Sequence, residues 1–279
     1  MNENNKIRIL FLNPKAVKSS VLKIWLKNAF NLVLKNPQPW MFFNFVFLTF
    51  NLLIAGIFST LAFSVSSGSA AVFFSQLVMT TANCLTLLGA YKLVNALIYN
   101  KTFKAKDFFM VYNYNKNHNF QFTILLFLII EIILSMYLNN IFPEINAKVN
   151  EFLNKTPTNR ESLEYIARYF TVLFGIKTII FFFTAPILPL ISLYEWNNNK
   201  VEYKTIIKNT FLALKRNIFV LLNLLLALFF LFFSSCTLLI TVLSAMPMLL
   251  LALFAVLLIF FFPFSLSCIF LAVKDIFME

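Results

Sequence analysis

The chain has 279 residues, of which 60% are apolar and 12% are charged, and its formal net charge at pH 7 is +12. Soluble globular proteins carry about 25% charged residues, so the composition excludes an ordinary soluble domain. Several apolar runs exceed the roughly 20 residues that a helix needs to cross a bilayer. We therefore expect an all-α polytopic membrane protein whose basic residues meet anionic lipid headgroups, and we expect no nucleic acid as partner.

Taken in chain order, a polar tail at 1–17 precedes a basic amphipathic helix over 18–35. Its apolar arc carries Trp25 and Phe30, and its polar arc carries lysines. A basic helix with a tryptophan on its apolar face is typical of the membrane interface. The alternative is a helix packed on the cytoplasmic ends of the spans. Pro37 ends the helix because proline lacks a backbone N–H donor.

The chain is predicted to cross the membrane six times, in three hairpins that form one membrane domain. The predicted spans cover 40–63, 71–98, 120–138, 165–194, 218–243 and 247–273. An amphipathic helix precedes each hairpin, and the three resulting units cover 18–99, 104–195 and 200–275. The first apolar run is too long for a cleavable signal peptide, so the first span is expected to act as a signal anchor.

Lys and Arg concentrate in segments on one side of the predicted spans, namely 1–39, 92–117, 200–217 and the C-terminus. Such segments stay in the cytoplasm, so both termini are expected there. Trp25, Trp40 and Trp196 then fall at the cytoplasmic interface, where aromatic belts form. The residues expected at the headgroups are Lys23, Trp25, Lys27, Lys35, Trp40, Lys204, Lys208, Lys215 and Arg216.

A seven-residue pattern occurs three times, shortly before a span each time: FNLVLKN at 30–36, FMVYNYN at 109–115 and FLALKRN at 211–217. Its fixed positions are Phe30 and Asn36, Phe109 and Asn115, and Phe211 and Asn217. Three hairpins that enter from the same side correspond to parallel repeats about an axis along the membrane normal. The alternative is that any amphipathic helix before a span shows this pattern.

Three stretches carry a resemblance to known proteins: IWLKNAFNLVLKNPQPW at 24–40, LTLLGAYKLVNALIYNKTF at 85–103 and FLAVKDIF at 270–277. With these the chain resembles a family of uncharacterised proteobacterial multi-pass membrane proteins. It is similar, more distantly, to the membrane domain found beside some glycerophosphodiester phosphodiesterases. Lys35 stands where the family pattern favours Arg, and the sequence contains no phosphodiesterase portion. The resemblance implies a membrane architecture and no particular activity.

Two ionisable residues lie inside predicted spans, Glu131 in the third and Lys177 in the fourth. Each is about 16–18 Å from the start of its span at ~1.5 Å per residue, near the midplane, and the two spans are arms of one hairpin. Intramembrane charges are functional candidates, here for a proton or substrate site in a conduit. The structural alternative is a buried ion pair that fixes the packing of the hairpin.

The predicted spans also contain asparagines and prolines. Asn44 and three further asparagines, at 51, 83 and 223, are expected to form hydrogen bonds between helices rather than a substrate site. Pro186, Pro189 and Pro263 either line a crevice or bend their helices.

Catalytic and metal-binding motifs are absent from the sequence. His118 is the only histidine, and HExxH, GxSxG and P-loop patterns do not occur. Cys84, Cys236 and Cys268 lie in apolar runs without a CxxC pair, so neither a disulfide framework nor a metal site is expected. We expect no cofactor and no enzymatic activity.

These features favour a non-enzymatic inner-membrane protein that organises or assists other membrane components, including lipids. Its expected partners are lipids with anionic headgroups on the cytoplasmic side, or another membrane protein. The alternative function is a transporter or lipid-translocating protein that uses Glu131 and Lys177.

Overall fold

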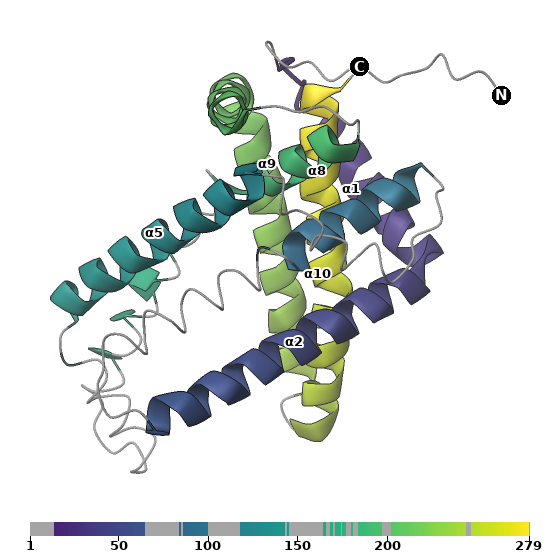
Figure 1. Cartoon of the computed structure of the whole chain (residues 1–279). Coiled ribbons are helices and arrows are strands. Elements are labelled where there is room, and N and C mark those ends of the chain that lie inside the picture. Colours follow the sequence, from purple (N-terminus) through teal and green to yellow (C-terminus); the bar gives the residue numbers. More distant parts are fainter. Residues whose placement is uncertain are drawn as a thin grey trace.

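A computed structural model of the chain shows a helical protein (Figure 1). The structure describes residues 14–64, 84, 86–99, 118–142, 144, 164–165, 168–169, 171–173, 175–176, 180, 184–196, 202–243 and 247–278. The labelled helices are α1 (Val21–Lys35), α2 (Pro37–Ser64), α5 (His118–Ile141), α8 (Ile187–Trp196), α9 (Tyr203–Leu243) and α10 (Pro247–Phe277). A shorter apolar helix covers Thr86–Ile98. The all-α prediction is confirmed for the described residues.

Three of the described helices are long and apolar enough to cross a membrane. Their apolar stretches are Gln121–Leu138 in α5, Tyr203–Leu239 in α9 and Ala255–Phe277 in α10. These three helices indicate a helical membrane protein.

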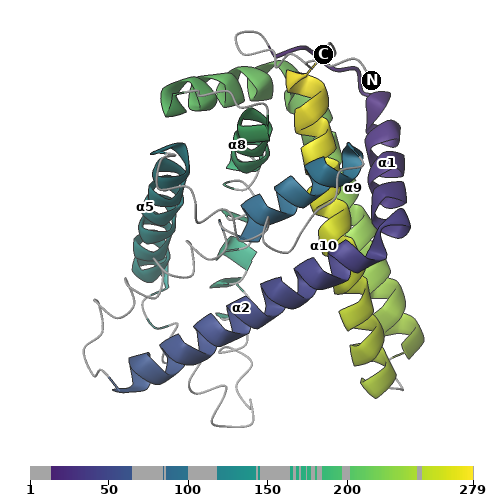
Figure 2. The same ribbon diagram turned by 45° about the vertical axis from the view of Figure 1, so that its right-hand side comes forward.

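Helices α9 and α10 lie side by side in opposite directions (Figures 1 and 2). Phe232 packs on Phe261, with the ring centroids 5.0 Å apart, while Leu221 and Ala272 line the same pocket near the other end of the pair. Helix α1 packs along the half of α10 that leads to the C-terminus. The core lies around that half of α10.

Helix α10 has two halves with different surroundings, divided at Pro263. In its first half the exposed large apolar side chains are Leu249, Leu253, Val256, Leu258 and Ile259, as expected of a surface in contact with lipid. From Phe264 to Met278 most side chains are buried against α1, α8, α9 and the Thr86–Ile98 helix. Only the second half of α10 is therefore a core element.

The break in hydrogen bonding at Pro263 is compensated by α2. Proline has no N–H to donate to the carbonyl four residues earlier, which belongs to Ile259. The Asn44 Nδ2 atom donates to this Ile259 oxygen at 2.8 Å. Phe43 and Phe47, on either side of Asn44 in α2, both pack against the ring of Phe262. Asn44 thus makes the interhelical hydrogen bond that the sequence predicts.

Replacement of Asn44 by Leu should destabilise the protein by about 1 kcal/mol, because an interhelical hydrogen bond in a membrane protein contributes roughly 0.6–2 kcal/mol. Denaturation in mixed micelles with increasing SDS would measure the change. The double variant Asn44→Leu/Pro263→Ala should recover stability, because alanine restores the N–H that bonds the Ile259 carbonyl. Equal stability of Asn44→Leu and the unmodified protein would contradict this role.

The amphipathic helices of the first and third units end in the same way. Asn36 follows α1 with φ −131° and ψ 59°, and Asn217 interrupts α9 with φ −123° and ψ 18°. Each amide donates to the carbonyl four residues earlier, that of Leu32 at 3.0 Å and that of Ala213 at 3.1 Å. The two asparagines of the sequence pattern therefore mark the bends. Phe109 and Asn115 of the second unit lie outside the described residues.

The orientation of the two helices differs. Figure 2 shows the first part of α9 (203–216, green) lying across the direction of α10, whereas α1 (purple) runs beside α10. The pairings of Trp25 with Asp275 and of Phe30 with Phe260 fix α1 in that position. The structure thus has α1 packed on another helix, as the second interpretation of the sequence expects.

A strap of residues, 14–20, joins the bend of α9 to the end of α10. Lys15 donates from its backbone N to Ile276 O and from Nζ to Met278 O, both at 3.0 Å. Asn217 accepts from Val17 N at 2.8 Å and donates to Lys15 O at 3.0 Å. The strap therefore holds the N-terminal segment, the bend and the C-terminal end of α10 in one junction.

Candidate functional site

The first part of α9 presents one basic face. Lys204, Lys208, Phe211 and Lys215 are exposed, and their spacing of 4, 3 and 4 residues places them on one side of the helix. On the opposite side Ile206, Thr210 and Leu214 are buried in the core. We call the four exposed residues the α9 stripe. Its three lysines lie where the sequence predicts exposed basic groups.

Arg216, the remaining basic residue predicted for this helix, is engaged within the protein. Its Nη1 atom donates to the backbone oxygen of Pro14 at 2.8 Å. Part of its role is therefore to hold the strap.

Helix α1 carries a stripe of the same spacing. Lys23 and Lys27 are exposed, and Phe30 follows at the position that matches Phe211. The apolar-arc prediction is wrong for Phe30, which is 45% exposed on the side of these lysines because it lies three residues after Lys27. Its ring lies 5.7 Å from that of Phe260 in α10. Lys35 is exposed at the far end of α1, away from the C-terminal end of α10.

Two of the three tryptophans are buried, although the sequence predicts all three in an aromatic belt at the membrane interface. Trp25 is 1% exposed, and its Nε1 donates to Asp275 Oδ2 at 2.6 Å. Trp40 is 2% exposed and packs edge-on against Phe43. Both residues are thus buried between helices, where their rings contribute packing. Trp196 is the last residue of α8, and its side chain lies outside the described part.

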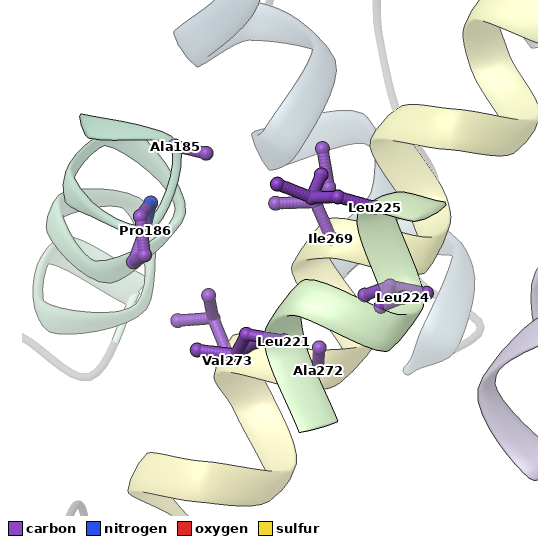
Figure 3. Close-up of a pocket in the computed structure, with 8 residues that line it drawn as sticks. All are labelled: Ala185, Pro186, Leu221, Leu224, Leu225, Ile269, Ala272 and Val273. Atoms are coloured by element: carbon purple, nitrogen blue, oxygen red, sulfur yellow. The ribbon is translucent and has the colours of Figure 1, made fainter. Parts of the chain in front are cut away.

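An apolar slot lies between α8 and the α9–α10 pair (Figure 3). Ala185 and Pro186 face Leu225, Ile269 and Val273 across it, and all of the residues that line it are apolar. Its volume of about 20 Å³ is close to the space of one water molecule, and apolar cavities of this kind stay dry. The slot offers no group for chemistry, so we interpret it as a packing gap that Pro186 lines.

The predicted charge pair lies outside the described side chains. Glu131 has its backbone in α5, but its side chain is not among those described, and neither is any part of Lys177. The surroundings are partly described: Leu134 and Leu138 of α5, together with Phe142 directly after it, form a buried cluster with apolar side chains between 165 and 180. The two segments expected to carry the pair therefore pack against each other.

Sequence reasoning missed Asn95, a polar residue in the core. Asn95 is fully buried on the Thr86–Ile98 helix, and neither of its amide atoms has a hydrogen-bond partner among the described residues. It lies one turn after Tyr91, whose ring stacks on Phe270 of α10. The signal available in the sequence was a single amide within the apolar run from Leu93 to Ile98.

The remaining candidate groups supply little for catalysis. No group of three or more His, Cys, Asp or Glu side chains occurs within the part of the chain that the structure describes. Cys84 and Cys268 are buried in the apolar core. His118 begins α5, and its side chain is outside the described part.

Asn223, predicted to pack between helices, is exposed on α9.

The chain matches no protein-family model, no curated protein and no solved structure. The resemblance to a proteobacterial membrane protein family therefore stays a prediction.

Proposed function

We propose that the chain is a non-enzymatic integral membrane protein that organises or assists lipids and other membrane components. It would cross the inner membrane of a bacterium six times, in three related hairpins, with both termini in the cytoplasm. The observation that supports this most is the α9 stripe, since its basic residues face outward from a helix that lies across the direction of α10. A helix in this position suits the plane of the headgroups.

The length of α9 supports this placement of its two parts. Its apolar stretch of 37 residues would measure about 55 Å at ~1.5 Å per residue, longer than a hydrocarbon core of ~30 Å. The part after the bend at Asn217 is about 39 Å long by the same rise, which is sufficient for one crossing. The amphipathic first part is then free to follow the membrane surface.

Lipid dependence of the folded state tests the proposed function. Protein purified in mild detergent should retain lipids or a membrane-protein partner, detectable by mass spectrometry. Complete delipidation should lower the melting temperature, and lipid added back should restore it, because a ligand of the native state stabilises that state. A delipidated protein with an unchanged melting temperature and no co-purified partner would contradict the proposal.

A transporter or lipid-translocating protein that uses Glu131 and Lys177 is the second candidate. The contact of α5 with the 164–180 segment favours it, because it allows groups on these two segments to meet. This function requires water near the pair, whereas a structural ion pair does not.

Thiol accessibility distinguishes the two roles of the charge pair. A cysteine placed at Leu134, one turn from Glu131 and 5% exposed, should not react with a membrane-impermeant thiol reagent if the interface is dry. The background needs Cys84, Cys236 and Cys268 replaced by Ala or Ser. A cysteine at Ile133, which is 61% exposed, is the matched control and should also stay unreactive, because it faces lipid. We expect neither to react; labelling at Leu134 alone would instead establish a water-filled path.

A further inference from the structure

We propose that the α9 stripe is a binding surface for the phosphate groups of anionic phospholipids, with Lys204, Lys208 and Lys215 on the headgroups and Phe211 among the acyl chains. This deepens the proposed function, on which it rests, by naming the lipid class and the residues. The four side chains lie on one face of one helix, so a flat arrangement of headgroups contacts all of them.

The comparison of the two stripes supports this assignment. Lys23, Lys27 and Phe30 have the same spacing on α1, where the Phe30 ring is 45% exposed and packs edge-on against Phe260 of α10. Phe211 is 60% exposed on a helix that lies across α10. Exposure of an aromatic ring to water is unfavourable. At the boundary of headgroups and acyl chains the ring of Phe211 contacts the acyl chains on one side, so this cost is small.

Charge complementarity selects the ligand. Three lysines on one face, with no carboxylate at any position from 203 to 217, favour an anionic surface over a zwitterionic one. Each lysine near such a surface contributes roughly a fivefold gain in affinity, so loss of all three should weaken binding by about 100-fold. The lysine head reaches phosphate while its methylene stem stays on apolar surface. The chemistry therefore fits phosphatidylglycerol-like headgroups.

The test uses the full-length protein in detergent, titrated with phosphatidylglycerol or phosphatidylcholine, and counts bound lipids by native mass spectrometry. The triple variant Lys204→Gln/Lys208→Gln/Lys215→Gln should lose about 100-fold in affinity for phosphatidylglycerol and little for phosphatidylcholine. The triple Lys→Arg variant should bind as the unmodified protein does, because the charges remain. Lys18→Gln removes one exposed lysine outside the α9 stripe and, compared with Lys208→Gln alone, should cause no comparable loss.

Two further measurements distinguish free phosphate from phospholipid and determine the contribution of the Phe211 ring. Inorganic phosphate at the same concentration should not displace phosphatidylglycerol, since the free anion lacks the acyl chains that Phe211 contacts. Phe211→Ser should weaken binding of both lipids, whereas Phe211→Leu should not. Full displacement by phosphate, or equal losses in the Gln and Arg variants, would overturn the proposal.

Failure of the lipid-binding proposal for the α9 stripe can be distinguished from failure of the proposed function. If the triple Gln variant keeps its affinity for phosphatidylglycerol while delipidation still lowers the melting temperature, the α9 stripe is the wrong surface and the proposed function stands. Unchanged phosphatidylglycerol affinity together with loss of an acidic membrane protein from the purified triple variant would also overturn the lipid assignment. If neither lipid nor partner affects stability, both proposals fail.

Discussion

Asn217→Ala should destabilise the protein by about 3 kcal/mol, because the side chain makes three hydrogen bonds and is 2% exposed. Two of them hold the strap, at Val17 N and Lys15 O, and the third closes the end of the preceding helical turn at Ala213 O. The melting temperature in detergent should fall by roughly 5–10 °C. Cleavage near the N-terminus by added protease should also become faster, since the strap loses its attachment.

The matched control is Asn36→Ala. Asn36 occupies the aligned position and donates to Leu32 O in the same way, but it has no contact with the strap that is described. Its replacement should therefore cost about 1 kcal/mol. If the two variants lose the same free energy of unfolding, the hydrogen bonds between Asn217 and the strap contribute nothing to stability. Arg216→Gln, which removes the bond to Pro14 O, should give an intermediate loss.

Trp25→Ala should be the most damaging single change in α1, with a loss of about 3–5 kcal/mol. The indole is enclosed between α1 and α10, and a cavity there would be lined by protein rather than filled by lipid. Trp25→Phe keeps most of the ring but removes the Nε1–H bond to Asp275. Because that bond has a charged acceptor, this variant should lose about 1.5–3 kcal/mol.

Ile24→Ala is the control for helix α1. Ile24 is adjacent in sequence and 53% exposed, so its truncation should change the free energy of unfolding by less than about 0.5 kcal/mol. Unfolding by SDS in mixed micelles would compare the variants under one condition. A large effect of Ile24→Ala with a small effect of Trp25→Ala would mean that α1 presents its other face to the protein.

The amphipathic faces of α1 and of the start of α9 follow from helical periodicity. Trp25 and Ala29 of the predicted apolar arc are buried and the lysines of the polar arc are exposed, whereas Phe30 of the apolar arc is 45% exposed. The bends at Asn36 and Asn217 were also predictable, because asparagine readily bonds its own preceding turn and leaves the helical conformation.

The helical periodicity of the sequence did not predict the contacts that assemble the core. The bond between Trp25 and Asp275 joins residues 250 positions apart, and the strap joins residues 14–17 to positions more than 200 residues later. Such pairings depend on which surfaces meet after the helices form. Asn44 is an intermediate case, since its hydrogen bonding was predictable but its partner, the carbonyl freed by Pro263, was not.

The sequence by itself determined that this is a helical membrane protein with basic amphipathic helices that end at asparagine, because length, apolar content and periodicity act within one helix. Only the tertiary structure decided that α1 runs beside α10 while the start of α9 lies across it. The physical reason is that two helices with the same faces are oriented by what they pack against. Trp25 and Phe30 of α1 contact Asp275 and Phe260 of α10, whereas Phe211, which matches Phe30, has no ring contact within the described part of the chain and is 60% exposed.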